Sequence, residues 1–138
     1  MVMETTILDK DVHVFYITAA SFPLGVMEAH NKLHALVPFS ANRRYFGISR
    51  PEDGPIVYRA AAEELEPGEA EKMHCDTLVL KKGKYISLVI NDFMKDVQSI
   101  GNVFRQLLSY PGLDPNGYCV ELYLGDKDVK CMVRLKDY

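Results

Sequence analysis

The fold of this chain is decided by residues 13–36, HVFYITAASFPLGVMEAHNKLHAL. The first six residues are rich in β-branched and aromatic side chains, which is typical of a strand. Ser21 can then cap a helix, and Pro23 fits the first turn of that helix. Apolar residues recur at spacings of four and three until Pro38, which places them on one helical face. They are Phe22, Val26, Ala29, Leu33 and Leu36.

The same pattern returns at residues 84–107, KYISLVINDFMKDVQSIGNVFRQL, an offset of 71 positions from His13 to Lys84. Asp92 takes the place of Ser21 as the expected helix cap. The apolar residues of the second helix are Phe93, Val97, Ile100, Phe104 and Leu107. Because the element order and spacing recur together, the chain is expected to contain two copies of one unit.

Further strands are expected on both sides of the acidic stretch 64–72, which contains Pro67 and Gly68 and is interpreted as a solvated connection. The expected strands are 44–49, 56–63, 75–80, 118–124 and 129–136. The predicted fold class is α+β, an antiparallel sheet of about eight strands with two main helices. Two strand-helix-strand-strand pseudo-repeats, about 11–64 and 75–137, would surround a central cleft within a single domain of residues 1–138.

The composition excludes several classes of function. Sixteen Lys and Arg against nineteen Asp and Glu, net charge −3, disfavour direct nucleic-acid binding. The N-terminal segment fits neither a secretory signal nor a membrane span, so a cytoplasmic protein is expected. Three cysteines without a CxxC pair indicate reduced thiols. The sequence gives no sign of a cofactor or a metal site.

Alternation along the strand Cys119–Leu124 yields the leading candidate for a ligand contact. Val120, Leu122 and Leu124 would pack beneath the helices, which sends Glu121 and Tyr123 to the opposite face. By the same argument Tyr45 and Gly47 lie on that second face in the first half, with Gly47 as the counterpart of Glu121. In the strands that lead into the two helices, the same alternation sends Tyr16 and Tyr85 to this second face. Four tyrosines and one carboxylate would then line an aromatic cleft suited to planar, apolar or cationic compounds.

Plainer interpretations stand beside this one. An isolated Glu on a strand is usually solvated, and Glu121 could simply pair with Arg134 on the next strand. Arg59 and Met132 are weaker candidates for ligand contacts. His30 and His34, four apart on the first helix, lack a third metal ligand and are interpreted as a solvated helix edge.

Four short motifs resemble the GyrI-like small-molecule-binding family, which includes effector-binding domains of AraC-type and MerR-type transcription regulators. The motifs are Tyr45-Phe46-Gly47-Ile48-Ser49-Arg50-Pro51, Gly83-Lys84-Tyr85, Glu121-Leu122-Tyr123 and Met132-Val133-Arg134-Leu135. The resemblance spans about residues 13–136. It implies a stand-alone effector-binding domain in which aromatic side chains and Glu121 hold amphipathic or cationic ligands, with a possible link to transcription regulation through a separate partner.

Two alternatives remain open. Some relatives hydrolyse reactive drug-like compounds, and Glu121 could act as the general base of such a reaction. The absence of tryptophan weakens this enzymatic interpretation, since the hydrolytic relatives use one. Other relatives bind proteins, so the chain could be an interaction module such as a DNA gyrase inhibitor. The sequence favours binding over catalysis.

Overall fold

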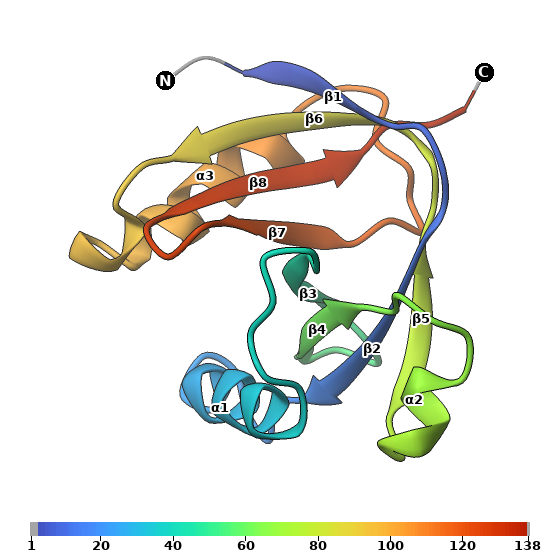
Figure 1. The fold of residues 1–138 in the computed structure, drawn as a ribbon. Helices are drawn as coiled ribbons and strands as arrows, with labels where there is room; N and C mark the ends of the chain where they lie inside the picture. The colour runs from blue at the N-terminus through green and yellow to red at the C-terminus, as the bar shows by residue number, and fades with distance from the viewer. Residues whose placement is uncertain (1–2, 138) are drawn as a thin grey trace. The chain divides into compact units, whose positions relative to one another are not determined.

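The computed structural model describes residues 3–137, and within them the contacts divide the chain into two compact units. The first unit is Asp11–Leu80. The second unit combines residues 3–10 with residues 81–137. Each unit contains a four-stranded antiparallel sheet and one long helix (Figure 1), so the predicted α+β class with eight strands and two main helices is confirmed.

In the first unit the strand order is β3-β4-β2-β5. Its elements are β2 (Val12–Thr18), α1 (Val26–Leu36), β3 (Tyr45–Pro51), β4 (Ile56–Glu63), α2 (Glu69–Lys72) and β5 (Asp76–Leu80). Helix α1 packs against β2 and β4 through Ala29 and Leu33, which are fully buried.

In the second unit the strand order is β1-β6-β8-β7. Its elements are β1 (Glu4–Leu8), β6 (Gly83–Ile90), the 3-10 turn η1 (Phe93–Lys95), α3 (Gln98–Leu108), β7 (Cys119–Leu124) and β8 (Asp128–Arg134). Figure 1 shows α3 lying along β6 and β8. Val103, Phe104 and Leu107 of α3 form the core together with residues of these strands.

The strands at the unit boundary differ from expectation. Sequence patterns did not predict β1, which is short and pairs with β6. The strand expected at 75–80 is present as β5, but it pairs with β2 of the first unit and not with the strands of the second half. Both neighbours of β6 are occupied, by β1 and β8, so β6 offers β5 no free edge.

Both helices begin later than predicted. Gly25, not Ser21, occupies the N-cap of α1, and residues 21–25 form a turn. Asp92 precedes η1 rather than α3, in a left-handed conformation and without a side-chain capping bond. Phe22 and Val97, expected on the buried stripes, are 44% and 55% exposed because they precede the regular helices.

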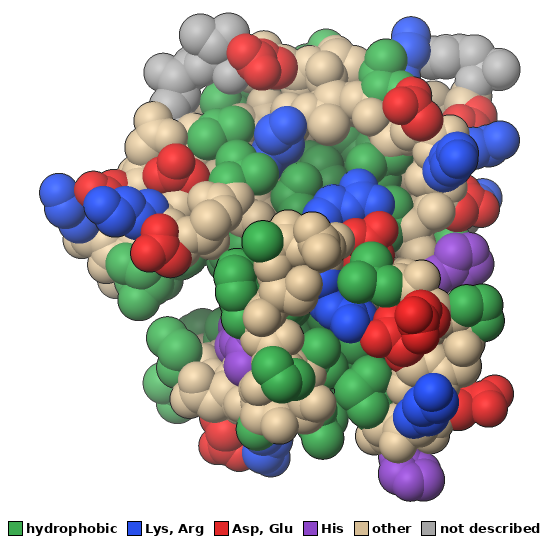
Figure 2. Space-filling model, in the orientation of Figure 1, with side chains coloured by type: hydrophobic (Ala, Val, Ile, Leu, Met, Phe, Trp, Pro, Cys, Tyr) green, Lys and Arg blue, Asp and Glu red, His purple; other side chains and the backbone are tan. Residues whose placement is uncertain are grey.

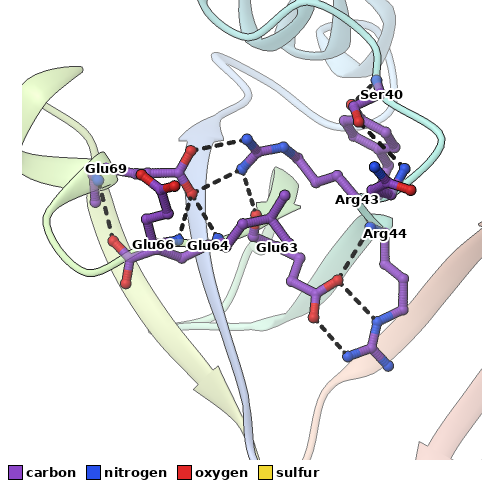
Figure 3. Close-up of polar contacts among 11 residues, drawn as sticks. Ser40, Arg43, Arg44, Glu63, Glu64, Glu66 and Glu69 are labelled. Atoms are coloured by element: carbon purple, nitrogen blue, oxygen red, sulfur yellow. Dashed lines mark hydrogen bonds and ion pairs between the residues drawn. The ribbon is translucent and has the colours of Figure 1, made fainter.

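The acidic connection after β4 is ordered by ion pairs rather than simply solvated (Figure 3). Arg43 binds Glu69 through two hydrogen bonds of 2.8 and 3.1 Å and also donates to the carbonyl of Glu63. The Glu63 carboxylate in turn binds Arg44. These bonds anchor the turn that contains α2 to the start of β3.

Candidate functional site

Glu121 is a buried carboxylate in the middle of β7, with only 8% of its surface exposed. It lies directly opposite Cys131 of β8 in the antiparallel ladder. The hydroxyl of Tyr123 donates a 2.6 Å hydrogen bond to Glu121 Oε1, and the Tyr123 ring lies 5.8 Å from that of Phe93. An aromatic residue on the same strand thus orients the carboxylate.

The surroundings of Glu121 are largely apolar. Burial, reinforced by the negative charge of Glu121, raises the pKa of Cys119 to about 11. The same two causes raise the pKa of the Cys131 thiol still further, with a smaller contribution from Cys119. Both thiols are therefore protonated at neutral pH, and a carboxylate in such a setting interacts strongly with any cation that reaches it.

The face on which Glu121 lies was predicted wrongly. Opposed residues in an antiparallel ladder point to the same side of the sheet, and the ladder aligns Leu88, Cys131 and Glu121 in one row. Leu88 and Cys131 belong to the core under α3, and Cys119 and Tyr123 pack against it. Glu121 therefore shares the helix-covered face, whereas Val120 points to the other side.

The first unit shows the same reversal. Tyr45 lies on the α1 side, with its ring 5.2 Å from His34 and 5.4 Å from Phe39, and its hydroxyl accepts a 2.8 Å bond from the Ser40 amide. Gly47, two residues along β3, faces the same way. Phe46 and Ile48, predicted to lie beneath the helix, are fully buried on the opposite side.

This reversal has a physical reason. Both faces of each sheet are buried at the centre, so apolar character does not distinguish the helix side from the other side.

Tyr16, Tyr85 and Arg59 lie on the sheet faces that the helices do not cover, so the predicted group of four tyrosines is divided. The Arg59 guanidinium stacks 5.1 Å from the Tyr16 ring centre and binds both oxygens of Glu52. The Tyr85 hydroxyl donates a 2.7 Å bond to the carbonyl of Lys81. In the second unit, the expectation that Tyr85 shares a face with Glu121 was wrong, because the ladder puts the two on opposite sides. In the first unit, Tyr16 and Arg59 lie on the face opposite Tyr45 and Gly47.

Arg134 does not fit the expected pairing with Glu121. Its guanidinium instead binds Asp114 at 3.0 Å and Asp137 at 2.9 Å. It lies opposite Tyr85 in the ladder, on the face away from α3. Met132, the other weak candidate, is fully buried on that same face.

Sequence reasoning missed an aromatic cluster under α1. His30, interpreted as part of a solvated edge, is half-buried, and its Nε2 forms a 2.8 Å hydrogen bond with the hydroxyl of Tyr58. Burial, with a smaller effect of His34, lowers the pKa of His30 to about 4, so the ring is neutral at neutral pH. Phe22 also stacks on Tyr58, with the ring centroids 5.9 Å apart. The alternation of Tyr58 with the small residues Ala60 and Ala62 was the available signal.

Apolar side chains also reach the surface around α1 (Figure 2). Those at least 44% exposed are Phe22, Leu24, Met27, Leu36 and Phe39. Over residues 3–137, no group of three or more His, Cys, Asp or Glu side chains is arranged to hold a metal ion. None of the helices in this range is long and apolar enough to cross a membrane.

Comparison with known proteins identifies the fold of this chain but does not assign it to a family. No protein-family model matches the chain, and no curated protein matches it. Solved structures do match over almost the whole length. The chain shares their fold.

Three of these structures are informative. An integron cassette protein from the mobile metagenome of Vibrio cholerae is similar at a TM-score of 0.74 and 11% identity, covering 97% of this chain and 95% of that one. SAV2435, solved bound to tetraphenylphosphonium, is similar at 0.72 and 16%, covering 99% and 94%. A Staphylococcus aureus MU50 protein named "Putative bacterial transcription regulation protein" is similar at 0.67 and 16%, covering 99% of both chains.

Proposed function

We propose that this chain is a small-molecule-binding domain of the GyrI-like type that senses or sequesters amphipathic, aromatic or cationic compounds. The observation that carries the proposal is the buried carboxylate of Glu121, held by Tyr123 in largely apolar surroundings. A protein of the same fold, SAV2435, was solved with the lipophilic cation tetraphenylphosphonium, which supports the ligand class.

The chemistry of Glu121 favours this class over simple ions. A small inorganic cation loses its hydration shell on entering apolar surroundings, and a single carboxylate does not replace that shell. A lipophilic organic cation is weakly hydrated, gains from burial of its apolar groups and still attracts the carboxylate. The combination of one buried charge and aromatic rings therefore selects bulky cations.

Each unit has a candidate contact set on its helix-covered face. In the second unit this set is Glu121 and Tyr123; in the first unit it is Tyr45 and Gly47. Tyr16, Tyr85 and Arg59 are weaker candidates than the sequence indicated, since their polar groups are engaged with Arg59, Lys81 and Glu52 respectively.

Isothermal titration calorimetry with tetraphenylphosphonium tests the proposal. We expect the wild-type protein to bind it, and Glu121→Gln to weaken binding by about 1–3 kcal/mol, since a desolvated charge pair is lost. Glu71→Gln is the matched control, because it makes the same chemical change at an exposed position of α2. Tetraphenylborate, an anion of closely similar shape, should bind far more weakly than the cation.

Equal affinity of wild-type protein and Glu121→Gln for tetraphenylphosphonium would remove Glu121 from the site. Equal affinity of the wild type for the cation and the anion would show that shape, not charge, governs binding. Absence of binding to either compound would overturn the assignment of the ligand class.

A link to transcription regulation is the finer part of the proposal, and the fold shared with the Staphylococcus aureus MU50 protein supports it. If binding controls expression, transcripts that respond to tetraphenylphosphonium in cells with the wild-type protein should lose that response in cells that carry Glu121→Gln. An unchanged response would leave binding without this regulatory role.

Hydrolysis is the second candidate function. A Listeria innocua protein described as a hydrolase is similar in fold at a TM-score of 0.55 and 8% identity. In this role Glu121 would take a proton from water as the water attacks an electrophilic ligand. Mass spectrometry of p-nitrophenyl acetate incubated with protein should then show catalytic turnover that Glu121→Ala abolishes; equal product with both proteins excludes this role for Glu121.

A further inference from the structure

The sequence between β5 and β6 is one of the two places where the chain passes from one unit to the other, and it is very short. Leu80 ends β5 in the first unit, and Gly83 begins β6 in the second. Only Lys81 and Lys82 lie between these strands. Any reorientation of the connected strands must therefore be absorbed by very few backbone dihedrals.

Both carbonyls of this connection are bound by side chains of the second unit. The Tyr85 hydroxyl donates to the Lys81 carbonyl at 2.7 Å. Arg134 donates to the Lys82 carbonyl through Nε at 3.1 Å and through Nη2 at 2.7 Å. The donor residues Arg134 and Tyr85 are 6% and 2% exposed, although Lys81 and Lys82 themselves are exposed.

Arg134 is itself fixed from two other segments. Asp114, in the loop between α3 and β7, accepts from Nη1 at 3.0 Å, and Asp137 near the C-terminus accepts from Nη2 at 2.9 Å. Backbone bonds join the same segments: the Asp114 amide donates to the Arg134 carbonyl, and the Lys136 amide donates to the Gly112 carbonyl. Three segments distant in sequence therefore meet at one guanidinium.

Gly83 is adapted to this arrangement. Its φ of +137° lies in a region that side chains rarely adopt, and a Cβ there would lie 2.9 Å from Arg134 Nη2. The glycine thus allows the guanidinium to approach the backbone of the connection. The Gly83-Lys84-Tyr85 motif supplies both this close approach and the Tyr85 hydroxyl.

We propose that Arg134 and Tyr85 form a latch on the Lys81–Gly83 connection, and that this latch controls the local opening of the connection between β5 and β6. Because Asp137 binds the Arg134 guanidinium, residues near the C-terminus take part in this latch. It also gives Tyr85 and Arg134 a conformational role in place of the ligand-contacting or charge-pairing roles that the sequence indicated.

Hydrogen–deuterium exchange of the intact protein without ligand tests the latch, so the result does not depend on the proposed function. Tyr85→Phe removes one bond, and Arg134→Lys keeps the charge but loses the planar fork that reaches two acceptors and the Lys82 carbonyl together. We expect either variant to speed exchange of peptides covering residues 80–85 by roughly tenfold, the effect of losing about one buried hydrogen bond to the connection. Peptides covering β3 and β4 should be unaffected.

Two variants serve as matched controls. Tyr110→Phe removes a hydroxyl from a tyrosine that is 38% exposed, and Arg44→Lys weakens an arginine–carboxylate pair in the first unit. Neither should alter exchange at residues 80–85. If exchange there is unchanged in Tyr85→Phe and Arg134→Lys, or rises only as much as in every other peptide, there is no latch and the residues merely stabilise the unit. If Arg134→Lys does not fold, Tyr85→Phe and Asp137→Asn decide the question, since Asp137 is 72% exposed in its side chain.

Discussion

At the scale of single residues, the charge of Glu121 has effects that can be measured without any ligand. The carboxylate lies on the same sheet face as Cys119 and Cys131, and it contributes to the raised pKa of both thiols. The thiolate is the reactive form of cysteine, so the alkylation rate of a thiol reports its pKa as well as its exposure. The alkylation rate of Cys119, which is half-buried, therefore reports the charge of Glu121.

We expect iodoacetamide at mildly alkaline pH to modify Cys75 first, Cys119 slowly and Cys131 last, because burial raises the pKa of Cys119 to about 11 and Cys131 is fully buried. Glu121→Gln should speed modification of Cys119 several-fold. A nearby negative charge disfavours the negatively charged thiolate, so removing that charge lowers the pKa of the thiol. Peptide mass spectrometry measures both rates. Unchanged Cys119 reactivity would mean that Glu121 carries no charge under these conditions.

Glu69 contributes to the pH dependence of the stability of the first unit. Its hydrogen bonds with Arg43, together with those from the Leu65 and Glu66 amides, lower its pKa to about 2, against a reference value of 4.5. A lowered folded-state pKa stabilises the protein above pH 4.5, and that stabilisation is lost as the pH falls from 4.5 toward 2.

Glu69→Gln should therefore lower the free energy of unfolding at pH 7 by about 1.5–3 kcal/mol, the range for hydrogen bonds to charged groups. The difference in the free energy of unfolding between wild type and Glu69→Gln should narrow as the pH falls from 4.5 toward 2. Urea denaturation at several pH values measures it, and Glu71→Gln is the exposed control. A difference that is independent of pH would contradict the assignment to the ionised carboxylate.

At the scale of secondary-structure elements, helix α1 shows where periodicity succeeds and fails. The sequence placed Leu33 and Leu36 on the same buried stripe. The structure buries Leu33 completely but leaves Leu36, the last residue of α1, 44% exposed, whereas the next residue, Val37, is buried. Periodicity identifies which residues form the apolar face of a helix, but not at which residue that face stops being buried.

The two leucines therefore form a matched pair. Leu33→Ala should lower the free energy of unfolding by about 2–5 kcal/mol, the cost of a cavity in a packed core, whereas Leu36→Ala should change it by less than about 1 kcal/mol. Thermal or urea denaturation compares them. Similar losses for both variants would show that Leu36 is buried in solution.

At the scale of the whole molecule, the order of strands along the sequence does not follow the division of the chain into two units. The N-terminal strand β1 joins the sheet of the second unit, and β5 joins the sheet of the first. The boundary between units thus falls at Lys81, after β5, and not before the strand as the repeat pattern indicated. The connection held by Arg134 and Tyr85 lies at this boundary.

A cross-link tests the assignment of β5. His13 of β2 lies opposite Val79 of β5 in the ladder, and both side chains are exposed. His13→Cys combined with Val79→Cys should form a disulfide under mild oxidation, although the residues are far apart in sequence. Peptide mapping without reductant detects it, with the two single variants as controls. Failure of the pair to join, with the fold intact, would show that β5 does not lie beside β2.

The sequence by itself determined the order of the main strands and helices, apart from β1, and the central core residues of the two long helices. Alternation and helical periodicity are local properties, and the side-chain pattern records them directly. Only the tertiary structure decided which face of each sheet a helix covers, which unit receives β1 and β5, and which charges pair. These depend on contacts between distant segments, and where both faces of a strand are buried, as in β3 and β7, the local pattern is equally consistent with either side. The sequence placed Glu121 and Tyr123 together on one face of β7, and only the fold showed that this face also carries Cys131 and the core under α3.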